Sequence, residues 1–467
     1  MGVGIGIGTA GGAAPKLVVR EVDLRVRPLR LRLPFRFGAH TLTACPQVFV
    51  RVAVELEGHA RAHGFAAELM VPKWFDKRAA FTPRDNVGHL ALALSNAAAA
   101  YTNDAPATSF GLFARHCAAL MDAGRLQGLS ELSAAFGAAV IDRAVIDALC
   151  RATGCSFFDA ARANLLGIDS RLTPDLAGWD WNAWLPMLQP LARIEARHTV
   201  GLLDELDSEQ VGDDGLPISL RAVIARYGHR CFKIKLGGEP DADLARLRAV
   251  HAVLGATAGE YRHTLDGNEQ YANRDALKAL LAGLRELPTP LYIEQPMARE
   301  ASFDAALPGD AVAPFLMDEA DATLDAFVRG RGAGWRGVSS KGCKGLYKAL
   351  INRARCAQAG GRLFMSAEDL TCQAGLALQQ DLALVALLGI THSERNGHHY
   401  GDGFGIAPAH EKAAFVRAHR GLYDADARLR IDGGMLSVAS LAGPGFAHAA
   451  EPDWDSLQPP AAAPEML

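Results

Sequence analysis

The chain has 467 residues, of which 49% are hydrophobic and 21% are charged, and its formal net charge is −4. These values are typical of a globular protein with an ample core, and they give no electrostatic case for binding nucleic acid or an anionic membrane. No apolar run approaches the roughly 18 residues that a membrane-spanning helix needs.

The first residues and the cysteines indicate the compartment. Residues 1–14 are rich in Gly and Ala and lack the charged and apolar regions of a signal peptide, so we interpret them as a flexible tail. The eight cysteines are scattered and form no C-x-x-C pair, which argues against a disulfide framework or a cysteine zinc site. We therefore expect a cytoplasmic protein.

Residues 15–170 predict an α+β domain. Apolar residues alternate along much of 17–56, which predicts paired strands, with a loop expected over 34–45. Residues 84–153 are rich in Ala and show helical spacing, and Gly154 is placed to end the last helix as a C-cap.

From about residue 196 the pattern alternates between strands and helices. The expected strands are 198–202, 230–236, 262–266, 290–294, 314–318, 335–340, 362–366 and 389–393. The expected helices are 217–227, 240–255, 274–286, 300–307, 322–330, 345–359 and 372–388. Eight strands with intervening helices predict an α/β fold, a modified (β/α)8 TIM-type barrel, over residues 171–400.

The remaining residues, 401–467, are richer in Gly, Pro and Ala. A short strand-like piece at 429–431 predicts that this C-terminal segment packs back on the N-terminal domain. The expected architecture is therefore a barrel with an N-terminal α+β capping domain that the C-terminal tail completes.

Five polar clusters follow expected strands of the barrel at intervals of 23 to 31 residues. A strand, a loop and a returning helix use about that many residues, so the clusters lie at the same end of successive parallel strands and face one mouth. The clusters are Lys233-Ile234-Lys235, Asp266-Gly267-Asn268, Glu294-Gln295-Pro296, Asp318-Glu319 and Lys341-Gly342-Cys343-Lys344.

The acidic members of these clusters form a candidate metal site. Asp266, Glu294 and Asp318 are hard oxygen donors, which suit Mg2+ and also Mn2+. Taken singly, each could be an ordinary surface carboxylate. Together, at consecutive strand ends, they favour a metal site, with the adjacent Glu319 as an alternative to Asp318 or a neighbour that orients it.

The lysines are candidate acid–base groups. Alternation places Lys233 and Lys235 on one face of a strand, where crowding and burial are expected to lower a lysine pKa. Lys341 ends the sixth strand, across the barrel from the second, so Lys235 and Lys341 could flank one substrate carbon. Lys344 is expected in the following turn and Lys348 on the helix surface.

Several other side chains have weaker claims. Asn268 and Gln295 could orient metal ligands. The remaining candidates are substrate contacts, and the three at the ends of the last two strands could equally be structural ion pairs. They are His40, Glu368, Glu394 and Arg395. The pair His398-His399 lacks the H-E-x-x-H frame and is expected in a loop.

The clusters, their order and their spacing resemble the enolase superfamily, in particular its mandelate-racemase and muconate-lactonizing branch with Lys-x-Lys and an opposing lysine. The helix over 141–149 is similar to the one that precedes the barrel there. The resemblance implies one Mg2+ on Asp266, Glu294 and Asp318, and removal of a proton α to a substrate carboxylate to give a metal-stabilised enediolate.

The resemblance also implies a small carboxylate substrate, a homo-oligomer, and an insertion around 66–130. The mandelate-racemase branch has a histidine after the seventh strand. The segment from Phe364 to Glu368, which occupies that place here, contains no histidine, and this favours the two-lysine chemistry. The eighth strand reads Ser393-Glu394-Arg395 and lacks the Asp-x-Asp of dipeptide epimerases. Racemisation or epimerisation, cycloisomerisation and dehydration stay open as outcomes.

Two other functions remain open at this point. A Schiff-base aldolase on a TIM barrel would use Lys235 or Lys341 as its nucleophile and would leave the three carboxylates without a role. A barrel that only binds a ligand would need neither the lysines nor the carboxylates to be intact.

Overall fold

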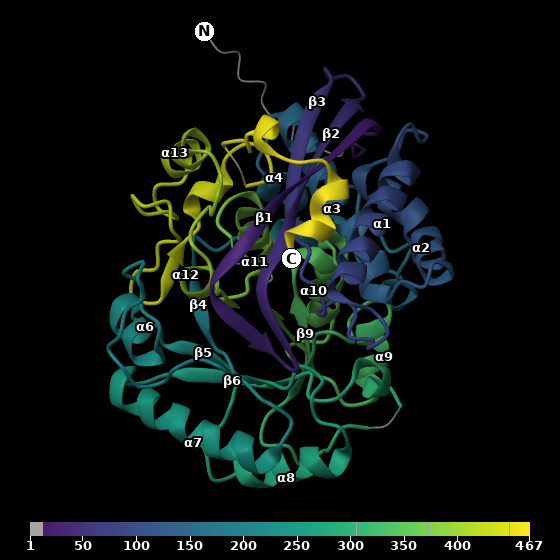
Figure 1. Ribbon diagram of the computed structural model, residues 1–467. Coiled ribbons are helices and arrows are strands. Elements are labelled where there is room, and N and C mark those ends of the chain that lie inside the picture. Colours follow the sequence, from purple (N-terminus) through teal and green to yellow (C-terminus); the bar gives the residue numbers. More distant parts are fainter. Residues whose placement is uncertain (1–12, 305, 369, 371–372, 448) are drawn as a thin grey trace.

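The computed structural model describes residues 13–304, 306–368, 370, 373–447 and 449–467. All but the last two residues of the expected flexible tail, and Asp369 beside Glu368, lie outside the described residues. Figure 1 shows an upper part built on the N-terminal strands and helices and a lower part that contains the barrel strands.

The N-terminal sheet has three antiparallel strands in the order β1 (Leu17–Phe37), β2 (His40–Leu56) and β3 (Ala62–Leu69). The expected loop over 34–45 is wrong, because β1 and β2 stay paired until Phe37 faces His40. Gly38 makes this tight turn possible with a φ of +52°. The strand β3 was not expected from the sequence.

Three helices cover this sheet, namely α1 (Pro83–Tyr101), α2 (Ser109–Leu126) and α3 (Glu131–Thr153). Each begins at a hydroxyl residue whose side chain accepts a hydrogen bond from the first turn. The expected C-cap is confirmed, since Gly154 is left-handed with a φ of 68°. Gly64 of β3 lies so close to α3 that an added Cβ would be 2.1 Å from the Ala144 carbonyl oxygen.

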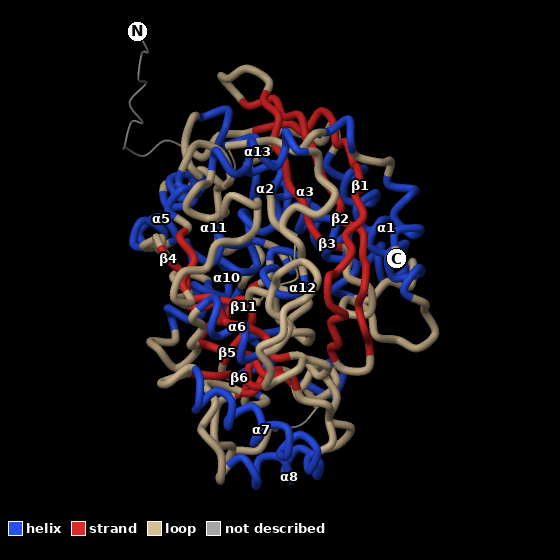
Figure 2. Tube along the Cα trace, turned by 60° about the vertical axis from the view of Figure 1, so that its left-hand side comes forward, coloured by secondary structure: helices blue, strands red, loops and turns tan. Residues whose placement is uncertain are grey.

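Eight parallel strands form the predicted barrel, which closes where β11 pairs with β4. They are β4 (Arg193–Val200), β5 (Cys231–Lys235), β6 (Arg262–Asp266), β7 (Ile293–Glu294), β8 (Phe315–Met317), β9 (Gly337–Ser340), β10 (Phe364–Ala367) and β11 (His392–Glu394). The first strand begins five residues earlier than expected. Figure 2 shows these strands as a group apart from the long strands of the cap.

The remaining helices pack around the barrel or connect it to the cap. They are α4 (Phe157–Arg162), α5 (Trp181–Trp184), α6 (Leu220–Tyr227), α7 (Pro240–Thr257), α8 (Arg274–Leu284), α9 (Ala326–Gly332), α10 (Leu346–Gln358), α11 (Leu376–Leu388), α12 (Gly397–Tyr400) and α13 (Ala409–Ala418). The helix expected over 300–307 is only a short 3-10 turn, η3 (Arg299–Ser302). His398 and His399, expected in a loop, lie in α12 and are buried.

The C-terminal segment contacts both parts of the protein. Its strand β12 (Met435–Ser437) pairs antiparallel with β4 of the barrel. The last turn, η7 (Pro460–Met466), packs against β1 and α1 of the cap. The strand expected at 429–431 is absent, since Leu429 forms only an isolated bridge with Tyr423.

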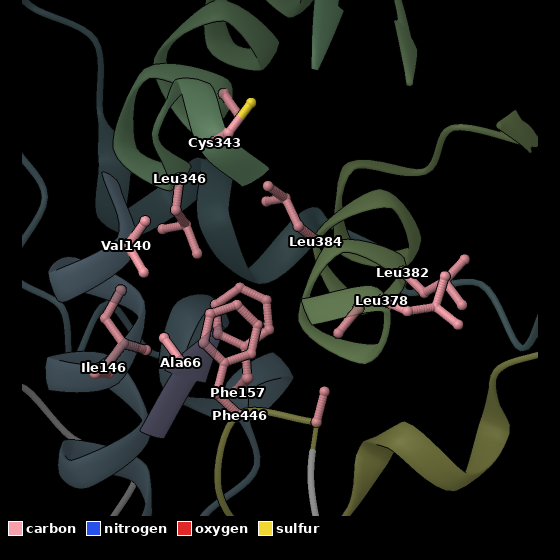
Figure 3. Packing of buried hydrophobic residues seen from close by; sticks show 14 of the residues in the cluster. Ala66, Val140, Ile146, Phe157, Cys343, Leu346, Leu378, Leu382, Leu384 and Phe446 are labelled. Carbon is pink, nitrogen blue, oxygen red and sulfur yellow. The ribbon is translucent and has the colours of Figure 1, made fainter. Parts of the chain in front are cut away.

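One continuous apolar core joins the cap to the barrel. Figure 3 shows Val140 of α3 facing Leu346 of α10, with Leu384 of α11 nearby. The rings of Phe157 and Phe446 stack with centroids 3.9 Å apart, so the C-terminal segment also contributes to this core. None of the helices in the described part of the chain combines the length and apolarity needed to cross a membrane.

Candidate active site

The carboxyl ends of the barrel strands bring the predicted polar clusters together. In the strand register, Lys235 lies beside Asp266, and Asp266 lies beside Glu294. Asp318 follows β8 directly, and Lys341 follows β9. Because parallel strands expose the same end, these five side chains meet at one mouth.

Lys233 is the centre of the charge network inside the barrel. Its Nζ lies 2.9 Å from carboxylate oxygens of Asp266, Glu294 and Glu394, and it also contacts Glu368. Burial alone would lower the pKa of Lys233, but the surrounding carboxylates raise it well above its usual value. The carboxylates therefore favour the charged form of Lys233, so it is not the lysine of this pair that is expected to be neutral.

The other two lysines each hold one carboxylate. Lys235 Nζ is 2.6 Å from Asp266 Oδ2, and Lys341 Nζ is 2.7 Å from Asp318 Oδ2. Burial opposes the charge on Lys341, but the Asp318 carboxylate outweighs it and raises the pKa of Lys341 above its usual value.

Two further lysines are deeper than expected. Lys344 lies in the turn after the sixth strand, as expected, but it is buried, and its Nζ lies 2.9 Å from Ser339 Oγ and 3.5 Å from Asp318 Oδ1. Lys348, expected on a helix surface, is buried with its Nζ 3.3 Å from Asp321 Oδ2. Burial lowers the pKa of Lys348 to about 8. Lys344 belongs to the 3-10 turn η4 (Gly342–Lys344), and Lys348 belongs to α10.

The three acidic groups have the donor chemistry of a divalent-metal site. Glu294 is fully buried, and its Oε2 has no hydrogen-bond partner among the described residues. Burial raises the pKa of Glu294 well above its usual value, and the nearby charges of Asp266 and Glu368 add to this. An additional cation would satisfy this oxygen and lower that pKa, so Asp266, Glu294 and Asp318 fit Mg2+ by donor type.

Their present arrangement is set by the lysines. Within the described chain, the oxygens of these three carboxylates do not all come within 4.8 Å of one another. Burial would raise the pKa of Asp266, but the Lys233 and Lys235 ammonium groups hold it below its usual value. Lys341 and Lys344 likewise overcome burial and lower the pKa of Asp318. Binding of a metal would therefore compete with these ion pairs.

Glu368 and Glu394 contact Lys233 inside the barrel, and Glu394 also lines the cavity above the lysines. Glu368 is held by Arg197 at 2.5 Å, and Glu394 accepts a hydrogen bond of 2.9 Å from Asn396 Nδ2. Burial raises the pKa of Glu368 despite Arg197, whereas Lys233 overcomes burial and lowers the pKa of Glu394 well below its usual value. Glu368 therefore makes structural ion pairs, which was the alternative to a substrate contact.

The expected orienting residues occupy three different positions. The backbone N–H of Asn268 donates to Asp266 Oδ1 at 2.9 Å. Gln295 Oε1 accepts from the backbone N–H groups of Asp318 and Ala320, so it fixes the loop that carries Asp318. Glu319 faces away from Asp318 and pairs with Lys77 at 2.9 Å.

A small cavity of about 30 Å³ lies above the lysines. A water molecule needs roughly 10–15 Å³, so this space holds about two waters and no substrate. Polar side chains form its floor and apolar side chains of the cap form its roof, and the ring of Trp74 lies 4.3 Å from Lys341 Nζ. The lining residues are Phe35, Phe37, Leu42, Val71, Trp74, Lys233, Lys235, Asn268, Lys341, Leu370 and Glu394.

Two of the candidate substrate contacts lie elsewhere. His40 lines a neighbouring outer pocket with Lys77 and Glu319, where burial and the Lys73 and Lys77 charges lower its pKa. Arg395 is directed at Asp381 of α11, at 2.5 Å, and does not line the cavity. Arg395 therefore forms a structural ion pair, which was the alternative to a substrate contact.

Sequence reasoning missed several groups of the site. Arg197 and Thr199 alternate on β4 and reach Glu368 and Glu394, and an earlier start for this strand would have revealed them. Lys77 had no sequence signal, because its partners Glu269 and Glu319 are distant along the chain.

The comparison with family models decides the family. Residues 218–448 match the model described as enolase C-terminal domain-like. This stretch, which holds all but the first of the barrel strands, is therefore a domain of the enolase C-terminal domain-like family. The match agrees with the predicted family of enzymes, and the closed barrel with an antiparallel cap confirms the predicted fold. A search of curated proteins found no match.

Solved structures of the enolase superfamily share the fold over nearly the whole chain. A muconate lactonizing enzyme from Pseudomonas fluorescens, complexed with muconolactone, is 16% identical with a TM-score of 0.61, covering 94% of this chain and 97% of that one. An enolase from Bradyrhizobium, complexed with magnesium and mandelic acid, is 18% identical with a TM-score of 0.60, covering 93% and 96%. A dipeptide epimerase from Enterococcus faecalis, complexed with Mg and L-Leu-L-Tyr, is 16% identical with a TM-score of 0.59, covering 92% and 100%.

Proposed function

We propose that this enolase-superfamily protein is a Mg2+-dependent isomerase or lyase that removes the α-proton of a small carboxylate substrate. The observation that carries the proposal is the placement of Lys235 and Lys341. They come from the second and sixth barrel strands and line one cavity, beside carboxylates at adjacent strand ends.

Asp266, Glu294 and Asp318 would hold the Mg2+, which would supply positive charge for the oxygen charge that develops when the α-proton leaves. Inside the barrel, five carboxylates (Asp266, Glu294, Asp318, Glu368 and Glu394) face five cations (Lys233, Lys235, Lys341, Lys344 and Arg197). A bound divalent cation would leave two positive charges in excess. A substrate carboxylate and one deprotonated lysine would balance them.

Lys235 is the proposed base and Lys341 the proposed acid–base group on the opposite side of the substrate carbon. Each contacts a candidate metal ligand, and release of Asp318 would remove the interaction that keeps the Lys341 ammonium charged. Lys233 is not a base in this proposal, because its ring of carboxylates keeps it protonated. Its role is to hold Glu368 and Glu394 inside the barrel.

The roof of the cavity indicates an apolar portion of the substrate. Phe35 and Phe37 come from the end of the β1–β2 hairpin, and Trp74 comes from the segment after β3. Because the cavity holds only about two waters, entry of a substrate requires these segments to move. Carboxylates with an aromatic or aliphatic group next to the α-carbon are therefore the first candidates.

Exchange of an α-proton for deuterium tests the proposal without knowledge of the product. The protein would be incubated with Mg2+ in D2O and a library of aromatic carboxylates, acid sugars and amino-acid derivatives, including mandelate, muconolactone and L-Leu-L-Tyr. We expect at least one compound to lose its α-proton signal in NMR spectra, which a matched Lys235→Ala sample should not reproduce.

A Schiff-base aldolase is the second candidate, because Lys235 and Lys341 line the cavity, but it leaves Asp266, Glu294 and Asp318 without a role. Borohydride trapping distinguishes the two. A covalent adduct on Lys235 or Lys341 after reduction would support the aldolase and contradict proton abstraction by these lysines.

A further inference from the structure

Three buried histidines converge outside the barrel. His198 lies on β4, His229 directly precedes β5, and His398 lies on α12. The Nε2 atom of His398 is 3.1 Å from Nδ1 of His198 and 3.0 Å from Nε2 of His229. All three nitrogens lie within 4.8 Å of one another, and none of the three side chains is more than 4% exposed.

This cluster is separate from the candidate active site. On β4 the neighbours of His198, Arg197 and Thr199, contact Glu368 and Glu394 inside the barrel. Side chains alternate along a strand, so His198 is directed to the other face of the sheet. There it meets α12 and the ring of His229, whose centroid lies 5.2 Å from that of His198.

The three facing nitrogens have too few protons to form two hydrogen bonds with one another. His229 Nδ1 lies 3.1 Å from the carbonyl oxygen of Ala196, which can only accept, so this nitrogen carries the proton and Nε2 of neutral His229 presents a lone pair. His398 Nε2 can donate one proton at most, yet it faces two nitrogens. In His398 the other nitrogen, Nδ1, is buried without a hydrogen-bond partner among the described residues.

A bound metal cation would satisfy the lone pairs of these nitrogens together. An additional proton would do so poorly, because burial disfavours a charged imidazole. Burial lowers the pKa of His229 to about 4 and the pKa of His198 and His398 well below the usual value, and mutual repulsion adds to this for the last two. Neutral imidazoles are the form that binds metals. The lone pairs are therefore available at neutral pH.

The spacing of the nitrogens suits a transition metal. A tetrahedral zinc ion has Zn–N distances of about 2.0–2.1 Å, which places neighbouring nitrogens roughly 3.3 Å apart. The contacts of 3.0 and 3.1 Å are close to that value. The hydrogen bond from His229 Nδ1 to a backbone carbonyl is the usual outer contact of a metal-binding histidine.

We propose that His198, His229 and His398 bind one Zn2+ ion, or a similar divalent transition metal, at a structural site outside the barrel. Imidazole nitrogens suit zinc, whereas the oxygen donors of the candidate active site suit Mg2+. The chain would then hold two different metals at two sites of different chemistry.

A metal at this site would link β4 and β5, the first two barrel strands, to α12, which follows the last strand. In that segment Asn396 Nδ2 donates to Glu394 Oε1 at 2.9 Å, and Asn396 Oδ1 accepts from the backbone N–H of Thr199. A metal on His398 would fix α12 against β4 and so hold Glu394 in the barrel. The site would stabilise the closed barrel without taking part in the reaction.

Metal content tests the proposal without any measure of activity. Untagged full-length protein would be stripped with a chelator, supplied with excess Mg2+ to occupy oxygen sites, given one equivalent of Zn2+, and desalted. We expect about one zinc per chain by mass spectrometry and a rise in Tm. His229→Gln and His398→Gln should each lower the retained zinc by at least tenfold, while the buried control His263→Gln should retain it.

X-ray absorption at the zinc edge of the wild-type protein keeps the test decisive if a variant fails to fold. A shell with three imidazole nitrogens would support the site. An oxygen-only shell, no retained zinc in the wild type, or equal retention in the His398→Gln variant would overturn it and leave a cluster of packed neutral histidines.

Discussion

Lys233 is the residue on which the polar interior of the barrel depends. Four carboxylates contact its ammonium group, and removing the charge would leave them facing one another in a buried site. The sequence placed Lys233 and Lys235 on one face of a strand, but it could not show that their surroundings differ. Lys235 contacts only Asp266 among these carboxylates and also lies at the cavity, which makes it the better candidate for a base.

The two lysines of the cavity carry the sharpest prediction at this scale. Lys235→Ala and Lys341→Ala should each lower the rate of α-proton exchange by roughly 10²-fold or more, the usual scale for general acid–base catalysis. For a racemase, each variant could retain exchange with one enantiomer only. Exchange rates in D2O measured separately with the two enantiomers of an active compound provide the test.

The control for this prediction is Lys278→Ala, a change of an exposed lysine on α8 that should leave the exchange rate unchanged. Lys344→Ala is unsuitable as a neutral control, because the Lys344 Nζ lies beside Asp318 and Ser339. If Lys235→Ala and Lys341→Ala both exchange at the wild-type rate, the two-lysine mechanism is wrong and a binding function gains support.

Residues that act through distant partners were the least predictable. Asp266, Glu294 and Lys235 could be placed from the sequence, because each ends an apolar strand at a regular interval. Lys77 could not, because it enters the site from a cap loop that no periodic pattern marks. The burial of Lys344 and Lys348 was missed because their partners, Asp318 and Asp321, are distant along the chain.

At the scale of elements, the packing of β3 on α3 joins the cap sheet to its central helix. The side chains of Glu68 and Arg143 form a buried ion pair of 2.9 Å across this contact. Gly64 permits the close approach, since a Cβ there would meet the backbone of Ala144 and Ala148. These contacts position the segment after β3, which carries Trp74 to the cavity.

We expect Gly64→Ala to destabilise the protein by about 1–3 kcal/mol, because the helix must move to make room for the added methyl group. The matched control is Gly88→Ala in α1, where an added Cβ meets nothing within 4 Å and helix propensity favours Ala. The free energy of unfolding in urea measures both. A Gly64→Ala variant as stable as the wild type would show that α3 does not pack this closely on β3.

Strong periodic segments were predictable as elements, and short irregular ones were not. Each of the eight barrel strands overlaps an expected strand, whereas the helix expected over 300–307 is only a short turn. The hairpin end of β1 and β2 was read as a loop, although Leu33, Phe35 and Phe37 continue the alternation as far as Gly38. The strand at 62–69 was missed because its alanines and glycine carry little β propensity.

At the scale of the whole molecule, buried neutral histidines make stability depend on pH. Burial lowers the pKa of His263 to about 3 in the folded state, against about 6.5 in the unfolded chain. The unfolded state therefore takes up a proton first, so this contribution to stability is complete above pH 6.5 and is lost as the pH falls below it.

The expected loss from His263 alone is about 2 kcal/mol between pH 7 and pH 5, since each pH unit below 6.5 costs about 1.4 kcal/mol. Urea unfolding at the two pH values would measure it. His263→Gln should reduce the difference, and the exposed control His59→Gln should not. An equal pH dependence in the wild type and His263→Gln would contradict the account of this histidine.

The cap and the barrel together enclose the cavity. The sequence predicted only part of this arrangement. The order of cap, barrel and C-terminal segment followed from composition and rhythm. The contact of β12 with β4 and the return of η7 to β1 are long-range pairings that no local pattern encodes. The His198, His229 and His398 cluster is another, because its members come together only when the barrel closes.

The dependence of α-proton exchange on Mg2+ tests the central claim most directly. Protein stripped by EDTA would be assayed in D2O with an active carboxylate, before and after Mg2+ is restored, beside an Asp266→Asn variant. We predict that exchange stops in EDTA, returns with Mg2+, and is strongly reduced in Asp266→Asn because one candidate ligand is lost. Full exchange in excess EDTA would contradict the claim that these carboxylates and lysines perform metal-dependent proton abstraction.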